Sequence, residues 1–594
     1  MTPLSRLLDE RVWPAFAVDL RSLALFRFGL GLLVCFDALG RLGDVGAFYG
    51  DHGVLPLGLL SESGDAWRWS LHRAMDGTGF SSLLILLQAL AGLALAAGFR
   101  TRRATLLAWV LAVSLCNRNP LVLGAGDVLL CALLFWGLFL PLAGRWSIDA
   151  TLTESPTPEA RHLSWASAAL TVQVLAVFFF NALHRSGPEW TQQASAWQQL
   201  MMLDGISRGL SPWLAVEPGL SAAITHWSQW LQLLGPPLFL LPTIGAARRR
   251  VGVSGVLRAI VLLQLLLLVA LTLATLAMGS IGWLLLVGLA ALVSGRFWDF
   301  LWRRRQRPAQ ARLRVFFDEH CAICRTASRM AVGLLLVDAE LAPARSNRRA
   351  DSLARANDSW VVLDHDDSAH LRGAALLLLL RRSPLLGWLG PALDKPVLRE
   401  AADHRYRQLA PHRQRLARGS AWLLPRPTAS LVPAVSASRW IGVILLLVLV
   451  GNALTLASPG NGLARLIAPP LQLLRLDQRW DAFAPSPPRQ ESRWTAPGRT
   501  IGAGDVNALP RDPAADEIRW RFYEERVGRA TSNQAALLSA WTQRLCREYN
   551  AGRAAGSPER LAEFRLVQLL RIAGRHNDEQ TEQRVLWRQD CATR

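Results

Sequence analysis

Lysine is almost absent from this chain of 594 residues, in which Lys395 is the only one. The formal net charge of +20 therefore comes almost entirely from arginine. These arginines gather at the ends of long apolar runs. That pattern is typical of membrane topology signals, whereas proteins that bind nucleic acid present a continuous basic stripe. The sequence therefore predicts membrane lipid as a partner and no nucleic acid.

Cysteine is also sparse. The seven cysteines are scattered and too few for the disulfide scaffold of a small secreted protein. The segment before Arg21 is polar, and the first apolar run is not followed by a small-residue cleavage site, so we expect no cleavable signal peptide. Because 51% of the residues are hydrophobic, the sequence instead favours a class of protein with a large apolar fraction.

Long apolar runs dominate the first half of the chain. A helix needs about 20 residues to cross about 30 Å of hydrocarbon. Runs of roughly this kind occupy residues 22–41, 80–98, 104–116, 121–143, 163–183, 221–242, 257–277 and 280–295, and a further one occupies 440–456. The pattern predicts nine membrane spans, of which the third and the eighth are short.

The arginines also indicate an orientation. If the N-terminus is cytoplasmic, the inner segments hold many more arginines than the outer ones, including the group from Arg296 to Arg312. The positive-inside rule then places the N-terminus and the segment around Cys321 in the cytoplasm, and everything after Ser458 in the periplasm. We therefore expect a multi-pass protein of the bacterial inner membrane.

The spans divide the chain into four predicted parts. Residues 1–300 form a bundle of eight spans, and residues 438–457 hold the ninth. Residues 312–425 alternate short apolar runs with helical patterns, as in an α/β domain of thioredoxin-like type. Residues 475–594 form a small periplasmic cap, with helical stretches expected from about 533 to 572. The predicted fold class is thus a polytopic α-helical membrane protein with an inserted cytoplasmic α/β domain and a small C-terminal periplasmic domain.

Cys321 and Cys324 are the only two cysteines at reactive spacing. They follow the apolar run 313–317 and open a helical pattern, which places both thiols at a helix N-terminus, where the helix dipole favours thiolate. Redox chemistry is the first hypothesis. A zinc site would need two more ligands, and no second Cys-x-x-Cys or His-x-x-x-His lies nearby. A relic pair without activity is the third interpretation.

A second group of candidates lies near the outer boundary of the spans. Polar and ionisable residues collect there: Asp37, Asp51, His52, Asn117, Arg118, Asp127, His184, Arg185, Glu189 and His226. Ionisable groups within spans are costly unless they are paired or hydrated, so they indicate either a functional site or ion pairs that hold helices together. The cysteines of the spans, Cys35, Cys116 and Cys131, are either packing residues or members of a redox relay. Whether Cys546 and Cys591 pair in the oxidising periplasm is open.

The cytoplasmic segment resembles the DCC family of thiol-disulfide oxidoreductase-like domains. The matching residues are Asp318-x-x-Cys321-x-x-Cys324-Arg325 and the later run 406–410, and the resemblance covers most of 312–420. It implies that Cys321 is the attacking thiol, that Cys324 resolves the mixed disulfide, and that Asp318 belongs to the motif. His320 stands where the family has a small polar residue, and it either stabilises the thiolate or is a surface histidine.

The membrane part resembles the HTTM domain, the bacterial relatives of vitamin K-dependent gamma-carboxylase. The matching stretches are 21–37, 48–56, 118–120, 126–127, 139–141, 147–149, His184–Trp190 and 480–485. The resemblance implies a scaffold for a reduced quinone, with a site on the outer face. A lysine pair supplies the catalytic base in the carboxylases, and His184 and Arg185 occupy the matching positions. Arginine does not act as a base at ordinary pH, which leaves His184.

Together these patterns predict a membrane-bound thiol-disulfide oxidoreductase. Its cytoplasmic Cys-x-x-Cys pair is coupled to an outer-face pocket that binds a quinone or quinol, or modifies a periplasmic protein substrate. A cytoplasmic thiol is the expected reductant. The predicted pocket residues are Asp37, His52, Arg118, Asp127, Arg185, Glu189 and Trp190, and no metal is expected. The alternatives are a carboxylase-like enzyme with His184 as its base, and a membrane scaffold or redox sensor without enzymatic activity.

Overall fold

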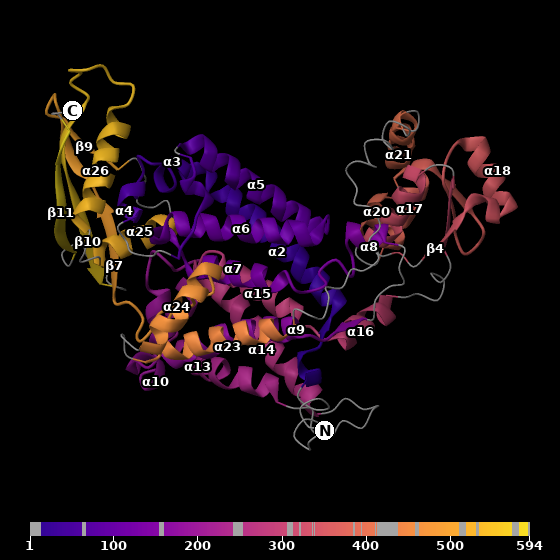
Figure 1. Cartoon of the computed structure of the whole chain (residues 1–594), viewed down its shortest axis with the longest axis horizontal. Helices are drawn as coiled ribbons and strands as arrows, with labels where there is room; N and C mark the ends of the chain where they lie inside the picture. Colours follow the sequence, from indigo (N-terminus) through magenta and orange to yellow (C-terminus); the bar gives the residue numbers. More distant parts are fainter. Residues whose placement is uncertain are drawn as a thin grey trace.

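The protein is described by a computed structural model that places residues 13–61, 67–75, 77–153, 160–241, 253–305, 313–319, 322–335, 337, 339–383, 386–393, 395–409, 412, 438–457, 462–509, 518–529, 534–572 and 581–591. Three regions follow from them: a helical bundle, a small α/β domain and a C-terminal cap of helices and strands (Figure 1).

Helices account for nearly all of the bundle. They are α2 (Leu20–Gly40), α3 (Val45–Phe48), α4 (Leu57–Ser61), α5 (Thr78–Ala97), α6 (Thr101–Arg118), α7 (Ala125–Gly137), α8 (Ile148–Leu152), α9 (Trp165–His184), α10 (Pro188–Thr191), α11 (Ala196–Met201), α12 (Ser211–Ala215), α13 (Pro218–Leu240), α14 (Val253–Thr275), α15 (Ile281–Ala291), α16 (Gly295–Arg305), α23 (Ser438–Leu454) and α24 (Gly462–Leu474). Short 3-10 turns are η2 (Trp13–Phe16), η3 (Leu42–Asp44), η4 (Leu71–Arg73) and η5 (Pro120–Val122), and β1 (Val18–Asp19) pairs with β2 (Arg161–His162).

A helix lies within each of the nine predicted apolar stretches. Within the described residues, four helical segments are long and apolar enough to cross a membrane: Leu20–Phe48, Thr78–Ala97, Trp165–His184 and Ser254–Thr275. The bent pair Ile281–Ala291 and Gly295–Trp302 would make a fifth. The structure therefore supports a helical protein suited to membrane insertion, and the number of nine spans stays a prediction.

Close backbone contact holds α2 against α5. A Cβ at Gly31 would lie 2.4 Å from the amide nitrogen of Ala96, and one at Gly92 would lie 2.7 Å from the carbonyl oxygen of Gly31. Small residues at such crossings let membrane helices approach closely, which increases dispersion contacts where no hydrophobic driving force acts between helices. At its start, α2 is capped by Asp19, whose carboxylate accepts the backbone N–H of Arg21 at 2.8 Å.

The α/β domain has a mixed sheet of four strands in the order β4-β3-β5-β6. Its strands are β3 (Leu313–Phe317), β4 (Ala339–Pro343), β5 (Val361–Leu363) and β6 (Ala369–Leu371); its helices are α17 (Ala322–Leu335), α18 (Arg348–Asn357), α19 (Arg372–Arg382), α20 (Gly390–Leu393) and α21 (Pro396–Leu409), with 3-10 turns η7 (Ala344–Ser346) and η8 (Gly387–Leu389). β3 is parallel to β4 and antiparallel to β5. The parallel pair with its connecting helix confirms the predicted α/β pattern of this segment.

The cap is an antiparallel sheet covered by two helices. Its elements are β7 (Gln490–Thr495), β8 (Pro497–Thr500), β9 (Asp505–Asn507), α25 (Ile518–Arg529), α26 (Gln534–Asn550), β10 (Leu561–Ile572) and β11 (Glu582–Asp590). The expectation of helix from about 533 to 572 is right for α26 and wrong for its second half. There, β10 pairs with β7, β8 and β11, and the buried side chains of Phe564 and Leu566 alternate with more exposed ones.

The α/β domain and the cap lie at opposite ends of the bundle (Figure 1). At one end, α17 packs against α8. At the other end, α25 packs against η5, and the aromatic core of the cap includes Phe48 of α3. The bundle helices run between these two ends, so a group in the α/β domain and a group under the cap are separated by the length of the bundle (Figure 1).

Candidate functional site

Two stretches that are far apart in the sequence meet beneath the cap. The turn 184–190 follows α9, and the loop 480–489 leads into the cap. The Gly187 N–H donates to the carbonyl of Pro485 at 2.9 Å, and the Trp190 indole N–H donates to the carbonyl of Phe483 at 3.1 Å. Gly187 allows this approach, because a Cβ there would lie 2.7 Å from the Pro485 carbonyl oxygen. The loop is thereby tied to the end of a predicted span.

Glu189 adds an ionic contact to this junction. It is buried, accepts a hydrogen bond from the Ser486 hydroxyl at 2.6 Å and forms an ion pair with Arg489 at 2.6 Å. These two hydrogen bonds lower the pKa of Glu189. Its carboxylate is therefore fully engaged in holding the loop.

Arg185 is the unusual group of the junction. Its side chain is 8% exposed, its Nε–H donates to the carbonyl of Ala482 at 3.3 Å, and its guanidinium stacks on Trp190 at 3.9 Å from the ring centroid. Among the described residues no carboxylate pairs with it. Burial lowers the pKa of Arg185 to about 9, so it is still a cation at neutral pH. A buried cation that lacks an anionic partner is costly, and such groups concentrate at functional sites.

A cavity of about 1290 Å³ opens beside Arg185 and Trp190, between the bundle and the cap. Its walls within the bundle come from α9, α14 and α15 and are mainly apolar, with Phe178, Leu268 and Ile281 as examples. Its walls within the cap carry most of the arginines. Ligand pockets are typically concave and apolar with a few converging polar groups, which this cavity satisfies.

Of the seven residues predicted to form an outer-face pocket, only Arg185 and Trp190 line this cavity. The structure places Asp37 and Asp127 in a separate, buried ion network with Arg41 and Arg519. Arg41 pairs with Asp37 at 2.8 Å and also with Asp127, while Arg519 of α25 pairs with Asp37 at 2.5 Å and with Asp127 at 3.3 Å. This arrangement matches the interpretation in which charged residues hold helices together.

The remaining outer-face candidates are also apart from the cavity. Arg118 is buried and donates to the carbonyls of Leu55 and Gly50, both at 3.0 Å. His52 is exposed and accepts a hydrogen bond at its carbonyl from Arg547. The His184 Nε2 lies 3.0 Å from the Thr455 hydroxyl just after α23, and His184 is not among the residues that line the cavity.

At the opposite end, Cys324 lies in the first turn of α17 and is disulfide-bonded. Asp318, which follows β3, is exposed. Cys321 and His320 lie outside the described residues, so their predicted roles rest on the sequence. The strand-then-helix context of Cys324 agrees with the predicted position of the thiol pair at a helix N-terminus.

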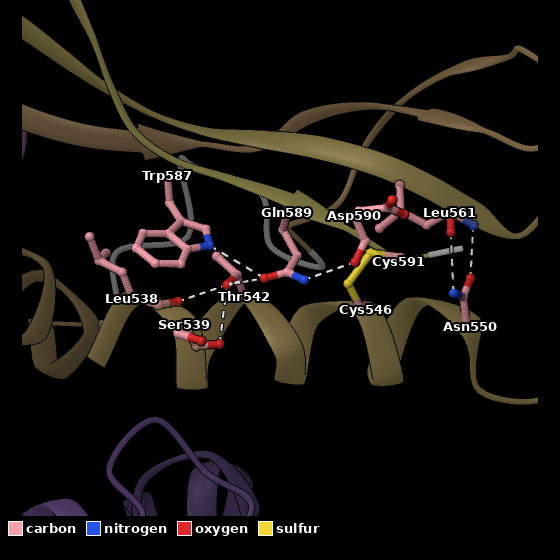
Figure 2. Close-up of a disulfide and its surroundings, with 10 residues drawn as sticks. All are labelled: Leu538, Ser539, Thr542, Cys546, Asn550, Leu561, Trp587, Gln589, Asp590 and Cys591. Atoms are coloured by element: carbon pink, nitrogen blue, oxygen red, sulfur yellow. Dashed lines mark hydrogen bonds between the residues drawn. A yellow bond between two sulfur atoms is a disulfide. The ribbon is translucent and has the colours of Figure 1, made fainter. Parts of the chain in front are cut away.

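The other cysteines separate into two kinds. The Sγ atoms of Cys116 and Cys131 lie 3.8 Å apart in the buried interior, and Cys35 is free and buried on α2. Cys546 of α26 and Cys591 after β11 form a disulfide with a Cα–Cα distance of 5.5 Å, as Figure 2 shows. The pairing that the sequence left open is therefore present in the structure.

Comparison with known proteins addresses one of these sites. Residues 315–419 match the family of DCC1-like thiol-disulfide oxidoreductases. This match includes Cys321 and Cys324 and confirms the DCC resemblance of this segment. No curated protein and no solved structure matches the chain. The resemblance of the bundle to the HTTM domain stays a prediction.

Sequence reasoning missed Arg41 and Arg519, which complete the ion network, and Phe483, which receives the Trp190 hydrogen bond. One signal was available: the turn 184–190 and the loop 480–485 were both selected for their resemblance to one domain. Two stretches of one site are expected to meet in space, even though nearly 300 residues separate them.

Proposed function

We propose that residues 315–419 carry out thiol–disulfide exchange on the cytoplasmic side of the membrane. The observation that carries this proposal is the family match, together with Cys324 held in a disulfide in the first turn of the helix that follows β3. The strand order β4-β3-β5-β6 supports a thioredoxin-like arrangement of the domain. A helix N-terminus favours the thiolate, which is the attacking species in exchange.

In the proposed reaction, the Cys321 thiolate attacks a substrate disulfide and releases one substrate thiolate. The Cys324 thiolate then attacks the mixed disulfide and releases the second. The substrate gains two electrons, and the protein is left with a Cys321–Cys324 disulfide. A cytoplasmic thiol reductant restores the dithiol. The basic ends of the spans and the position of this domain at the end of the bundle away from the cap support a cytoplasmic location.

The test uses the full-length protein in membrane vesicles. A disulfide substrate that dithiols reduce is supplied on the cytoplasmic side. Glutathione serves as the thiol reductant, and the change in its redox state measures the turnover. Cys321→Ser should abolish exchange, and Cys324→Ser should accumulate the mixed disulfide. Cys35→Ala, at a buried free cysteine of α2, is the matched control and should keep the wild-type rate. Wild-type turnover by Cys321→Ser would refute the proposal.

A coupling of this exchange to the outer face is the second part of the proposal. The cavity beneath the cap supports it as the place where a quinol would bind or a periplasmic substrate would be modified. Incubation of the reduced protein with excess ubiquinone should convert the Cys321–Cys324 dithiol to the disulfide, with one quinol formed for each disulfide. If the thiol pair keeps its redox state whatever quinone is added, the two ends are independent.

A further inference from the structure

The cavity beneath the cap has two chemically different ends. Its bundle side is lined by apolar residues of the helices α9, α14 and α15. Its cap side and rim are basic: among the described lining residues, eight arginines, including Arg185, Arg493 and Arg521, face five acidic residues. The excess of arginine creates a positive potential at the mouth of an otherwise apolar space.

One face of α9 shows how the two ends are connected. Val177, Phe178, Asn181 and Arg185 all line the cavity, and the helical period of about 3.6 residues places all four on one side of the helix. Val177 precedes Arg185 by eight residues, which corresponds to about 12 Å along the helix axis. The cavity therefore runs from Arg185 down into the apolar part of the bundle.

Arg185 is positioned to face an anion in this space. Trp190 covers one plane of the guanidinium, and the carbonyl of Ala482 accepts only its Nε–H. Its two terminal nitrogens, which supply four of the five guanidinium N–H donors, make no hydrogen bond to any described residue, although the side chain is more than nine-tenths buried and lines the cavity. The stacking alone falls short of offsetting the cost of burying a charge.

We infer that this cavity binds an anionic amphiphile, whose phosphate or carboxylate head pairs with Arg185 and whose apolar chain lies between α9, α14 and α15. A guanidinium binds both kinds of head with two parallel hydrogen bonds. Binding at this site is measured separately from the thiol chemistry of the α/β domain, which lies at the other end of the bundle (Figure 1).

Two sources supply this chemistry, a bilayer phospholipid and a free fatty acid. The experiment uses the full-length protein in detergent, with native mass spectrometry to count bound molecules. Phosphatidylglycerol and palmitate are the anionic ligands. Phosphatidylcholine tests the need for net charge, and inorganic phosphate tests the need for a chain. We expect at least one anionic amphiphile to bind at least tenfold more tightly than both phosphatidylcholine and phosphate, and the preferred one identifies the source.

The variant Arg185→Gln should lose this preference by at least tenfold, whereas Arg185→Lys should keep part of it. Arg499→Gln is the matched control, because Arg499 lies on the cap outside the cavity lining, is exposed and pairs with Asp505 at 3.6 Å. It should bind as the wild type does. A purely structural role of Arg185 predicts lower thermal stability with unchanged charge preference.

Three outcomes would overturn the inference: equal binding of phosphatidylcholine, equal binding by Arg185→Gln, or displacement of the lipid by a soluble acidic peptide. If Arg185→Gln does not fold, the charge and chain preferences of the wild type decide the question alone. Failure here leaves the exchange activity of Cys321 untouched, because that activity is measured separately.

Discussion

The α/β domain and the cap are attached to the same bundle in very different ways. The α/β domain touches it through α17, where a Cβ at Gly333 would lie 2.5 Å from the Cγ2 of Thr151 on α8. The cap instead sends arginines into the end of the bundle that it covers: Arg519 into the ion network, and Arg526 and Arg544 to backbone carbonyls of η5 and α3. The cap is therefore structurally part of the bundle, whereas the α/β domain packs against the bundle as a separate module.

The largest expected effect comes from the ion network. Arg519→Ala leaves Asp37 and Asp127 with Arg41 alone, and breaking a buried pair in this way costs about 3–5 kcal/mol. We expect the free energy of unfolding of the cap and bundle to fall by that amount in denaturant titrations followed by tryptophan fluorescence. Arg499→Ala, whose pair with Asp505 is exposed, should change it little. If the two variants lower the free energy of unfolding equally, the ion network does not join the cap to the bundle in the way proposed.

The disulfide of the cap gives the next effect. Cys546 and Cys591 are 45 residues apart, and a crosslink of this span typically contributes about 2–4 kcal/mol. The double variant Cys546→Ala and Cys591→Ala should unfold its cap at lower denaturant. A membrane-impermeant reductant should shift the wild type toward the variant and leave the variant unchanged. If the reductant affects both proteins alike, the disulfide does not stabilise the cap.

Low pH should also affect the stability of the two regions differently. Burial is the main cause that lowers the pKa of His72 in η4 to about 4, with further lowering by Arg118 and Arg41. Protonation therefore favours the unfolded chain, and the stability that neutral His72 contributes at pH 7 is lost as the pH falls from about 6.5 to about 4. The loss should reach about 2–3 kcal/mol at pH 4.5.

The control for this prediction lies in the α/β domain. Burial of Asp364 would raise its pKa, but hydrogen bonds from His365 and Arg382 outweigh that effect and lower the pKa to about 2. Its contribution is present above about pH 3.8 and is lost only below that value. Between pH 6.5 and 4.5, proteolysis should accelerate around η4 of the bundle and not at this pair. His72→Gln should remove the difference in unfolding free energy between these two pH values, and its persistence would assign the effect elsewhere.

The smallest expected effect concerns the contact between the α/β domain and the bundle. Gly333→Val places methyl groups where Thr151 already lies, and overpacking of this kind costs about 1–3 kcal/mol. The added cost falls on the contact between α17 and α8, so trypsin should release the domain faster while the unfolding of the bundle stays unchanged. Adding Thr151→Ala should restore the wild-type rate. A bundle that is destabilised as strongly as by Arg519→Ala would contradict the modular attachment.

Much of this architecture follows from local patterns. The apolar runs located the helices of the bundle, because a helix that avoids water needs a continuous apolar sequence. The run 313–317 followed by Cys321-x-x-Cys324 located β3 and the start of α17. The strand β10 was missed because half of its face is solvated and its arginines resemble a polar helix, and only pairing with β7 and β11 decides its conformation.

The candidate pocket was only partly predictable. Membrane topology predicts how deep a residue lies in the membrane, but it does not predict where the residue lies in the plane of the membrane. Asp127 and Arg185 share a predicted depth, yet the structure places Asp127 against Arg41 and Arg519, and Arg185 against Trp190. Arg519 lies 392 residues from Asp127, and Ala482, which accepts a hydrogen bond from Arg185, lies 297 residues from it; no local pattern encodes such contacts.

The position of Arg519 has a consequence for the order of synthesis. It follows Asp37 by 482 residues, so a ribosome that adds about 5–20 residues per second finishes it about 25–100 s later. During that interval, the cap-side ends of α2 and α7 hold two carboxylates and only one of their two arginines. This end of the bundle reaches charge balance only after the C-terminal region has been made and has folded against it, which makes docking of the cap the last step in completing the first helices.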